Sequence, residues 1–374
     1  MSEARQSELL GLSLQELTDI AENAGEPGYR GQQLFEALYR RRVLSFSDAS
    51  NLPKSFVGQL EAEGLSLGMP KIQHEFQSTD GTVRYLIALG DGQTVETVYM
   101  PGGDGGETGD GSEAGNQNSE TEHNRATICV SSQAGCAVDC QFCLTAFLGL
   151  KRNLTAGEIV GQISVVMNQQ HVSLPSDRIN IVFMGMGEPF LNYDQFMKAV
   201  RLLRDGVGLA ESRMTVSTAG VVPRIHDFGQ EPVRPKLAIS LNASNDQLRT
   251  KLMPINRKWN LEMLLDAARN LPLRPRERLT FEYVLLSEVN DSIENARELA
   301  QLVRGIRCKI NLIALNPGPG LPFGTPNSER VAEFQKALRN TGIPVFVRKP
   351  RGRDIFAACG QLKQTLERPD LNGS

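Results

Sequence analysis

Three cysteines with a short, fixed spacing are the strongest chemical signal in this sequence. Cys136, Cys140 and Cys143 lie within eight residues, in the pattern Cys-x-x-x-Cys-x-x-Cys. Three thiolates can hold three irons of a 4Fe-4S cubane, whereas a closed electron-transfer cluster or a structural zinc site normally needs a fourth protein ligand. The spacing therefore predicts a cluster in which one iron stays open to a ligand.

Two other interpretations of these cysteines remain open at this point. They could form a zinc knuckle completed by a distant Cys or His, or they could be buried cysteines that cluster by chance. The four histidines are scattered without metal-ligand spacing. Four of the six cysteines lie between Cys129 and Cys143, in a chain too long for a small disulfide scaffold. A metal site is the better interpretation.

Polar and glycine residues stand at the ends of several predicted strands. The run Met184–Pro189 closes one of them, where glycine permits close backbone approach to a ligand and Glu188 could receive a ligand ammonium. A dinucleotide-binding loop is excluded because Phe190 occupies the position of its third glycine. Ser217, Ser240 and Asn316 also lie at strand ends. Singly each is typical of a cap or turn, but together they indicate an active-site edge.

Repeated strand-then-helix units must position these residues. Such units predict an α/β fold with parallel strands and helical crossovers, and six of them suggest a partial (β/α)6 barrel. The Ser13, Thr155 and Asp291 capping boxes predict helix starts, and another helix follows Asn192. The predicted barrel strands are Thr127–Val130, Ile179–Met184, Met214–Ser217, Leu237–Leu241, Leu279–Leu285 and Lys309–Ala314.

Changes in sequence texture divide the chain of 374 residues. Helical periodicity marks an N-terminal accessory domain (1–68), and alternating strands with glycine turns mark a short β-meander (69–101). A core domain (125–356) carries the cysteine motif, and a tail (357–374) carries Cys359. Between meander and core, residues 102–124 are rich in Gly, Ser, Asn and Glu, which predicts a disordered loop.

Charge gives a clue to the partner once this loop is set apart. The chain has a formal charge of -3, but the loop holds six acidic residues and no Lys or Arg, so the remainder carries +3. Three basic runs could bind phosphates: Arg40–Arg42, Arg274-x-Arg276-x-Arg278 and Arg348-Lys349-x-Arg351-x-Arg353. The last adjoins Cys359.

No apolar stretch reaches about 18 residues, the length of a membrane span, and the polar start lacks the apolar core of a signal peptide. We therefore expect a cytoplasmic protein without a membrane segment, and we also expect it to be a monomer.

Taken together, these motifs resemble a known enzyme family. The cysteine spacing is similar to that of the radical S-adenosylmethionine (SAM) superfamily, and several further runs resemble the RlmN family within it over nearly the whole chain. Those runs are Val95–Pro101, Cys129–Cys136, Met184–Pro189, Met253–Asn256, Cys308–Leu312 and Ala358–Leu362.

The resemblance implies a methyltransferase that acts on C2 of adenine in RNA. Members modify adenosine 2503 of 23S ribosomal RNA and, in many cases, adenosine 37 of transfer RNA. One 4Fe-4S cluster and two SAM molecules serve each turnover, with an external electron donor such as flavodoxin. Cys136, Cys140 and Cys143 would hold the cluster, and SAM would contact Gly187, Glu188, Ser217, Ser240, Leu241, Asn242 and Asn316.

Two further cysteines and one acid gain roles from the same resemblance. Cys359 would accept a methyl from SAM and carry it to RNA as a covalent adduct, Cys129 would resolve the adduct by forming a disulfide, and Glu96 would act as the general base. Cys308 is expected in the core. The chain departs from the family in having Asn242 where His is usual, and in the length of the loop 102–124.

Three alternatives differ in their chemistry. A Cfr-type relative would methylate C8 of the same adenine with the same two cysteines, although the proline of Gly187-Glu188-Pro189 resembles the C2 group. A protein-activating radical SAM enzyme would not need Cys129 and Cys359 as a pair. A non-enzymatic iron-sulfur RNA-binding protein would not cleave SAM.

Overall fold

The computed structural model describes residues 7–102 and 125–365. A ten-stranded sheet dominates it, in the order β14-β13-β12-β11-β10-β9-β6-β5-β4-β3. Seven neighbouring strands are parallel: β6 (Arg125–Cys129), β9 (Arg178–Phe183), β10 (Met214–Thr218), β11 (Lys236–Ser240), β12 (Leu279–Leu285), β13 (Cys308–Ala314) and β14 (Val345–Val347). This curved parallel part is the predicted partial barrel.

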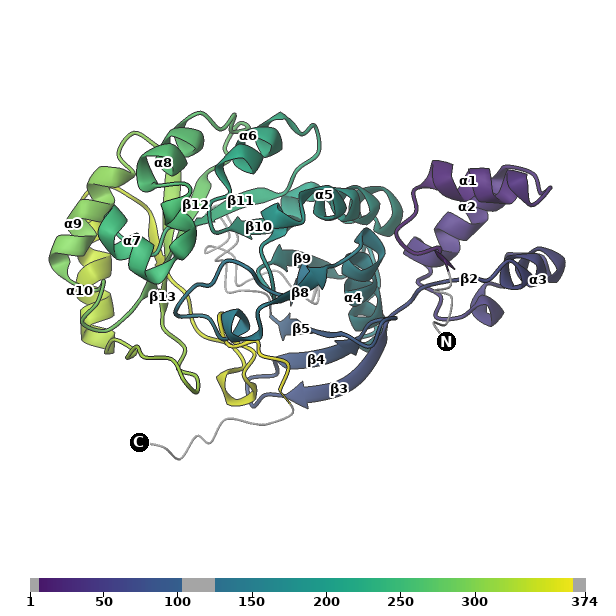
Figure 1. Ribbon diagram of the computed structural model, residues 1–374, viewed down its shortest axis with the longest axis horizontal. Coiled ribbons are helices and arrows are strands. Elements are labelled where there is room, and N and C mark those ends of the chain that lie inside the picture. The colour runs from purple at the N-terminus through teal and green to yellow at the C-terminus, as the bar shows by residue number, and fades with distance from the viewer. Residues whose placement is uncertain (1–6, 103–124, 366–374) are drawn as a thin grey trace.

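Helices cover the outer face of the curved sheet (Figure 1). They are α4 (Ala156–Gln169), α5 (Tyr193–Leu202), α6 (Val222–Gln230), α7 (Asp246–Leu252), α8 (Leu261–Arg269), α9 (Ile293–Leu302) and α10 (Ser328–Arg339). Short helical turns join them: η4 (Leu144–Leu148), η5 (Pro189–Leu191), η6 (Leu203–Val207), η7 (Glu211–Arg213), η8 (Pro254–Arg257) and η9 (Arg353–Ile355). Parallel strands need such crossovers, which here bury the outer face of the sheet.

The meander continues the sheet beyond β6. β3 (Lys71–Gln77), β4 (Val83–Ala88) and β5 (Thr94–Pro101) pair antiparallel in turn, and β5 pairs antiparallel with β6. Its turns contain Gly81 and Gly92, both with positive φ, in agreement with the glycine turns expected from the sequence. A separate hairpin of β7 (Gln133–Gly135) and β8 (Leu150–Asn153) frames the three-cysteine motif.

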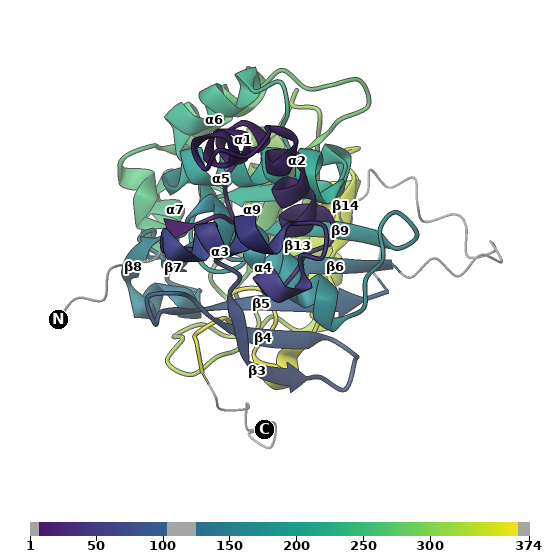
Figure 2. The same cartoon turned by 90° about the vertical axis from the view of Figure 1, so that its right-hand side faces the viewer.

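A small helical unit stands at one end of the molecule. It consists of α1 (Leu14–Asn23), α2 (Tyr29–Phe35), η1 (Glu36–Arg40), η2 (Phe46–Asp48) and α3 (Lys54–Ala62), closed by the short pair β1 (Ser7–Glu8) and β2 (Leu65–Ser66). Seen from the side, it lies against α4 and α5 (Figure 2). The contact is close, because a Cβ on Gly11 would lie 2.6 Å from the backbone nitrogen of Gly157 in α4.

Most predicted elements agree with the structure, with two corrections. The capping boxes at Ser13 and Thr155 are present, but the third box is formed by Ser292 and Asn295 instead of Asp291 and Glu294. Strand β14 was not predicted. Cys308 is 6% exposed and belongs to the main core, as expected.

Two predictions about chain organisation remain predictions. The loop 102–124 lies, except for its first residue, outside the described residues, and the same is true of the end of the tail. The proposed domain boundaries likewise await a test. Within the part of the chain that is described, no helix is both long and apolar enough to cross a membrane.

Candidate active site

A cavity of about 170 Å³ at the carboxyl ends of the barrel strands collects most of the predicted site residues. Ten of them line it: Cys136, Cys140, Cys143, Gly187, Glu188, Ser217, Ser240, Asn242, Asn316 and Cys359. We call this the inner cavity. The side chains of Leu241, Cys129 and Glu96 are not part of its lining. Residues separated by more than 200 positions in the chain thus meet at one edge of the sheet, as parallel barrels require.

The loop with the three cysteines packs their sulfur atoms in a largely apolar environment. It has its own hydrophobic cluster, which includes Val138, Phe142 and Met253. The Val138 N–H donates to Cys136 Sγ over 3.5 Å. Burial raises the pKa of Cys136 to about 12 and also raises the pKa values of Cys140 and Cys143. These thiols would ionise on binding iron, which replaces their protons.

The three cysteines line one cavity, which suits the thiolate ligands of a cluster. Among the described residues, no three His, Cys, Asp or Glu side chains converge on one ion position. In a cubane each thiolate binds a different iron, so three thiols around one cavity do not have to converge on a point. The polar strand ends opposite them leave a place for a ligand of the fourth iron.

Glu188 joins two of those strand ends. Its carboxylate accepts the N–H of Phe190 over 2.9 Å and that of Ala219 over 2.6 Å. Burial raises its pKa to about 7, against these hydrogen bonds. A ligand ammonium in the cavity would favour the ionised form. The preceding Gly187 has φ +101°, and a Cβ there would lie 2.6 Å from the side chain of Gln133, so only glycine fits.

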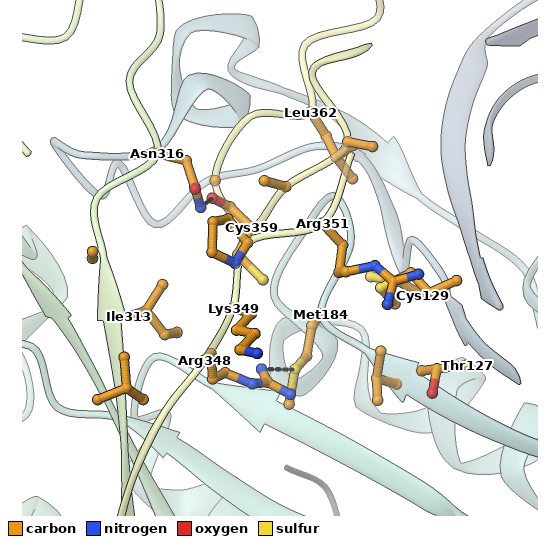
Figure 3. Close-up of a pocket in the computed structure, with 18 of the residues that line it drawn as sticks. Thr127, Cys129, Met184, Ile313, Asn316, Arg348, Lys349, Arg351, Cys359 and Leu362 are labelled. Atoms are coloured by element: carbon orange, nitrogen blue, oxygen red, sulfur yellow. Dashed lines mark hydrogen bonds between the residues drawn. The ribbon is translucent and has the colours of Figure 1, made fainter. Parts of the chain in front are cut away.

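Asn316 presents an unpaired acceptor to the same cavity. Its Nδ2 donates to the Cys359 carbonyl over 3.1 Å (Figure 3), while its Oδ1 is buried without a hydrogen-bond partner. Buried polar atoms are rarely left unpaired, so this oxygen is expected to meet a ligand donor. Ser217 and Ser240 lie opposite, with their hydroxyl oxygens 3.2 Å apart.

Asn242 reaches the cavity, but its amide is largely used within the protein. Its Oδ1 accepts the Val284 N–H over 2.8 Å, and its Nδ2 lies 3.3 Å from the Met253 sulfur. The side chain of Leu241 is fully buried, so this residue could contact a ligand only through its backbone. The unusual Asn is therefore accommodated by local contacts.

The sequence analysis missed Arg249, which holds the strand-end loops together. This fully buried guanidinium on α7 donates to the carbonyls of Leu241 (3.1 Å), Ala219 (2.7 Å) and Ser240 (3.1 Å), and to the side chain of Asn256 (2.9 Å). Its only cue in the sequence is its place four residues before the Met253–Asn256 run. A charged residue on a short helix otherwise indicates a solvated face.

A second, larger cavity adjoins the first and contains Cys359 together with a further cysteine. It measures about 550 Å³ and is lined by both Cys129 on β6 and Cys359 on the C-terminal segment (Figure 3). We call it the entrance cavity. Cys143, Asn316 and Cys359 line both cavities. Burial, and to a smaller extent the neighbouring Cys359, raises the pKa of Cys129 to about 12. Both cysteines are present as thiols.

Hydrogen bonds fix the Cys359 segment on both flanks. On one side, Leu144 N–H and the Thr145 hydroxyl each donate over 2.8 Å to the carbonyls of Gly360 and Leu362. On the other, the β3–β4 turn and residues 352–354 exchange contacts: Gly352 N–H donates to Asp80, and Thr79 N–H donates to Asp354, each over 3.0 Å. The cysteine is therefore held at the junction of the two cavities.

Glu96 lies outside both cavities, beneath the end of the C-terminal segment. It is fully buried on β5 and forms an ion pair with the equally buried Arg84 on β4. Arg84 also donates to the Thr365 carbonyl over 3.0 Å and stacks on Phe76, 4.1 Å from its ring centre. Burial raises the pKa of Glu96, despite the nearby guanidinium. A carboxylate with a raised pKa is a better proton acceptor near neutral pH.

This buried pair gives a stability prediction. Arg84→Met should cost about 3–5 kcal/mol of unfolding free energy, because it leaves the Glu96 carboxyl buried without its partner. Adding Glu96→Gln should recover most of that loss, since no unpaired charge remains. Denaturant unfolding of the two single variants and the double variant would measure the coupling. Additive losses would show that the two side chains do not interact as described.

Comparisons with known proteins agree with this geometry. Residues 130–300 match the model of the radical SAM superfamily, and residues 7–64 match that of the ribosomal RNA large subunit methyltransferase N-terminal domain. A crystal structure of a radical SAM methyltransferase from Sphaerobacter thermophilus superposes with a TM-score of 0.86 at 42% identity, covering 96% of this chain and 100% of that one.

Curated relatives extend the match along almost the whole chain. A probable dual-specificity RNA methyltransferase RlmN from Koribacter versatilis is 62% identical over 344 residues, covering 92% of this chain and 98% of the relative. A dual-specificity RNA methyltransferase RlmN from Syntrophobacter fumaroxidans is 44% identical over 353 residues, covering 94% and 96%. With its three-cysteine loop, its strand-end cavity and its second pair of cysteines, the chain belongs to the RlmN family of radical SAM RNA methyltransferases.

Proposed function

We propose that this methyltransferase places a methyl group on C2 of adenine, at adenosine 2503 of 23S ribosomal RNA and adenosine 37 of transfer RNA. One observation carries the proposal: Cys129 and Cys359 line a single cavity that adjoins the cavity of the three-cysteine loop. A methyl carrier must visit both the cofactor and the RNA base. Cys359 lines both cavities and therefore suits that role.

The enzyme uses a 4Fe-4S cluster and SAM, and the inner cavity contains the residues that would hold them. Cys136, Cys140 and Cys143 would ligate iron, while Glu188 and Asn316 would receive polar groups of SAM. When bound, the cluster supplies the electron that cleaves SAM, and SAM supplies the methyl group and the hydrogen-abstracting radical. The remaining steps belong to side chains of this chain.

Cys359 and Cys129 then divide the transfer between them. The Cys359 sulfur accepts the methyl group, the SAM-derived radical would remove one hydrogen atom from it, and the resulting methylene carbon forms the bond to C2 of the base, with the odd electron left on the adduct passing back to the oxidised cluster. Glu96 takes the C2 proton, which requires the C-terminal segment above it to shift, because the carboxylate is fully buried here. The Cys129 thiolate attacks the Cys359 sulfur, the sulfur–carbon bond breaks, and its electron pair takes a proton to complete the methyl group. The disulfide is reduced before the next turnover.

The entrance cavity suits an RNA nucleotide. Its volume of about 550 Å³ is in the range of small-molecule pockets. Four basic side chains contribute to its lining, Arg339, Arg348, Lys349 and Arg351, beside apolar residues such as Met184 and Ile313. A flipped base would contact the apolar part while its phosphates meet the cations.

Membership of the RlmN family favours C2 over the C8 specificity of Cfr-type relatives. We further propose that the enzyme works as a monomer in the cytoplasm, where ribosomal and transfer RNA are found, with a flavodoxin-like protein as electron donor. These points rest on the family and on the nature of the substrate.

Nucleoside mass spectrometry tests the proposed specificity. RNA from a strain lacking the gene should contain no 2-methyladenosine in the 23S ribosomal RNA and transfer RNA fragments named above, and the wild-type gene should restore it. Restoration in only one RNA class would narrow the substrate. Appearance of 8-methyladenosine instead would contradict C2 specificity.

A further inference from the structure

Release of the methylated RNA depends on a thiolate that the surroundings of Cys129 do not favour. This thiol must be ionised to attack the Cys359 sulfur. Cys129 is only 9% exposed, and burial raises the pKa of its thiol to about 12, with a smaller contribution from the neighbouring Cys359. Such a thiol is almost fully protonated at neutral pH. A buried group that has to carry a charge needs a compensating partner nearby.

One basic side chain of the entrance cavity is placed to compensate this charge. The basic residues that line the cavity are Arg339, Arg348, Lys349 and Arg351. Arg351 pairs with Asp80 over 3.3 Å, Arg339 donates to a backbone carbonyl of β14, and Lys349 is exposed. Of the four, Arg348 also lines the inner cavity, and its side chain is 10% exposed. It is therefore the cation that reaches farthest inward.

Met184 links Arg348 to Cys129. Its backbone N–H donates a hydrogen bond to the Cys129 sulfur, and its own sulfur lies 3.7 Å from Arg348 Nη1. Figure 3 shows the three residues in one cavity, with a dashed line from the guanidinium to Met184. Arg348 also lowers the pKa of the Cys129 thiol, against the effect of burial. The guanidinium thus acts on the charge of this sulfur.

The acidic partner of Arg348 does not cancel this effect. Glu282 on β12 pairs with Arg348 at 3.7 Å, and its side chain is 6% exposed. Glu282 lines the inner cavity and is not among the described residues that line the entrance cavity, whereas Cys129 lines the entrance cavity and not the inner one. The buried pair therefore presents its positive end to the cavity of Cys129, while the carboxylate holds the guanidinium in place.

Other titratable groups around Cys129 do not supply a positive charge. Cys359 disfavours the Cys129 thiolate, since two neighbouring thiolates repel each other. Cys143 lines the same cavity and is a predicted iron ligand. Glu96, on the neighbouring strand β5, is engaged in its own buried ion pair. The balance of charge at Cys129 thus depends on Arg348.

We propose that Arg348 is a positioning residue of the release step, whose positive charge stabilises the Cys129 thiolate that attacks the Cys359 sulfur. This inference rests on the proposed function. Cys129 loses its proton to water, and its sulfur bonds to the Cys359 sulfur as the sulfur–carbon bond breaks. The electron pair of that bond takes a proton to complete the methyl group on RNA. Arg348 exchanges no proton or electron in this step.

Alkylation of Cys129 tests the effect of the charge without RNA. The variants are made in the Cys359→Ala background and loaded with cluster, so that the predicted iron ligands are protected. Iodoacetamide reacts with thiolates, and mass spectrometry of the Cys129 peptide gives the rate at each pH. Arg348→Gln should slow the reaction at pH 8 at least about tenfold, because a nearby opposite charge shifts a pKa by roughly one unit or more. Arg348→Lys, which keeps the charge, should restore most of the rate.

Two further variants separate charge from structure. Arg339→Gln removes another arginine of the same cavity and should leave the alkylation profile of Cys129 unchanged. Arg348→Gln/Glu282→Gln leaves no unpaired buried acid and should fold even if the single variant does not, as circular dichroism would show. This double variant should also be alkylated more slowly than the parent protein. Alkylation at the parent rate in each folded variant that lacks Arg348 would overturn the proposal.

The covalent intermediate gives a second measurement. With Cys359 present, Arg348→Gln should be isolated partly joined to RNA, and the adduct should decay after transfer from pH 7 to pH 9, because Cys129 is still there to resolve it. Its decay at pH 7 should be at least about tenfold slower than that of the wild type. Decay at the wild-type rate would contradict the role of Arg348. Failure of the proposed function looks different, since Cys129→Ala itself would then trap no RNA.

Discussion

Cys129→Ala is expected to be isolated from cells covalently joined to RNA. The Cys359 sulfur would still accept a methyl group and its carbon would still bond to the base, but the thiolate that breaks the sulfur–carbon bond would be missing. Three cysteines line the entrance cavity: Cys359, Cys129 and Cys143. Because Cys143 is a predicted cluster ligand, no other thiol there can take the place of Cys129. The adduct should be sensitive to ribonuclease and resistant to reducing agents.

Two companion variants make this result specific. Cys359→Ala should be free of RNA and unable to methylate it, and should still assemble its cluster, because the predicted iron ligands lie elsewhere. The double variant should also be free of RNA, since no sulfur is left to form the adduct. Methylation by Cys359→Ala, or well-folded Cys129→Ala without attached RNA, would refute the two assigned roles.

Cys140→Ala should abolish both the cluster and SAM cleavage. This thiol lies between the other two in sequence, packs in the hydrophobic cluster of the loop and lines the inner cavity. Two remaining thiolates cannot anchor the three irons that a SAM-binding cubane presents to protein. After anaerobic reconstitution, iron and sulfide content should fall to background and no 5′-deoxyadenosine should form on reduction with SAM.

Cys308→Ala serves as the control for this loss. It removes another buried cysteine, but one in the main core on β13. Its cluster content should equal that of the wild type. Zinc in place of iron and sulfide in the anaerobically purified wild-type protein would contradict the iron-sulfur assignment altogether.

The sequence was most informative where chemistry and periodicity coincide. Buried parallel strands appear as short apolar runs, so β12 was predicted with its observed bounds, Leu279–Leu285. β14 was missed because it has only three residues and follows a proline, and such a strand depends on pairing with β13. Ser292 replaced Asp291 as a cap because the choice between adjacent capping residues is made by backbone geometry.

Two kinds of contact were not predicted: contacts between residues far apart in the sequence, and contacts made by buried charged side chains. Arg249 has the appearance of a surface residue of a short helix, yet its guanidinium is buried among backbone carbonyl groups at the ends of two strands, β10 and β11. The Arg84–Glu96 pair depends on strand register: Arg84 pairs with Val98, which makes Glu96 its diagonal neighbour across β4 and β5. The sequence alone does not state that register, so the pair emerged only from the structure.

The hydrogen bonds from Leu144 and Thr145 link the loop of the three cysteines to the segment that carries Cys359. Both donors directly follow Cys143, the last cysteine of the motif. A change in the fold of the cysteine loop would therefore also disturb the anchor of the C-terminal segment. The placement of the proposed nucleophile and the shape of the metal-binding loop are thus coupled through two hydrogen bonds.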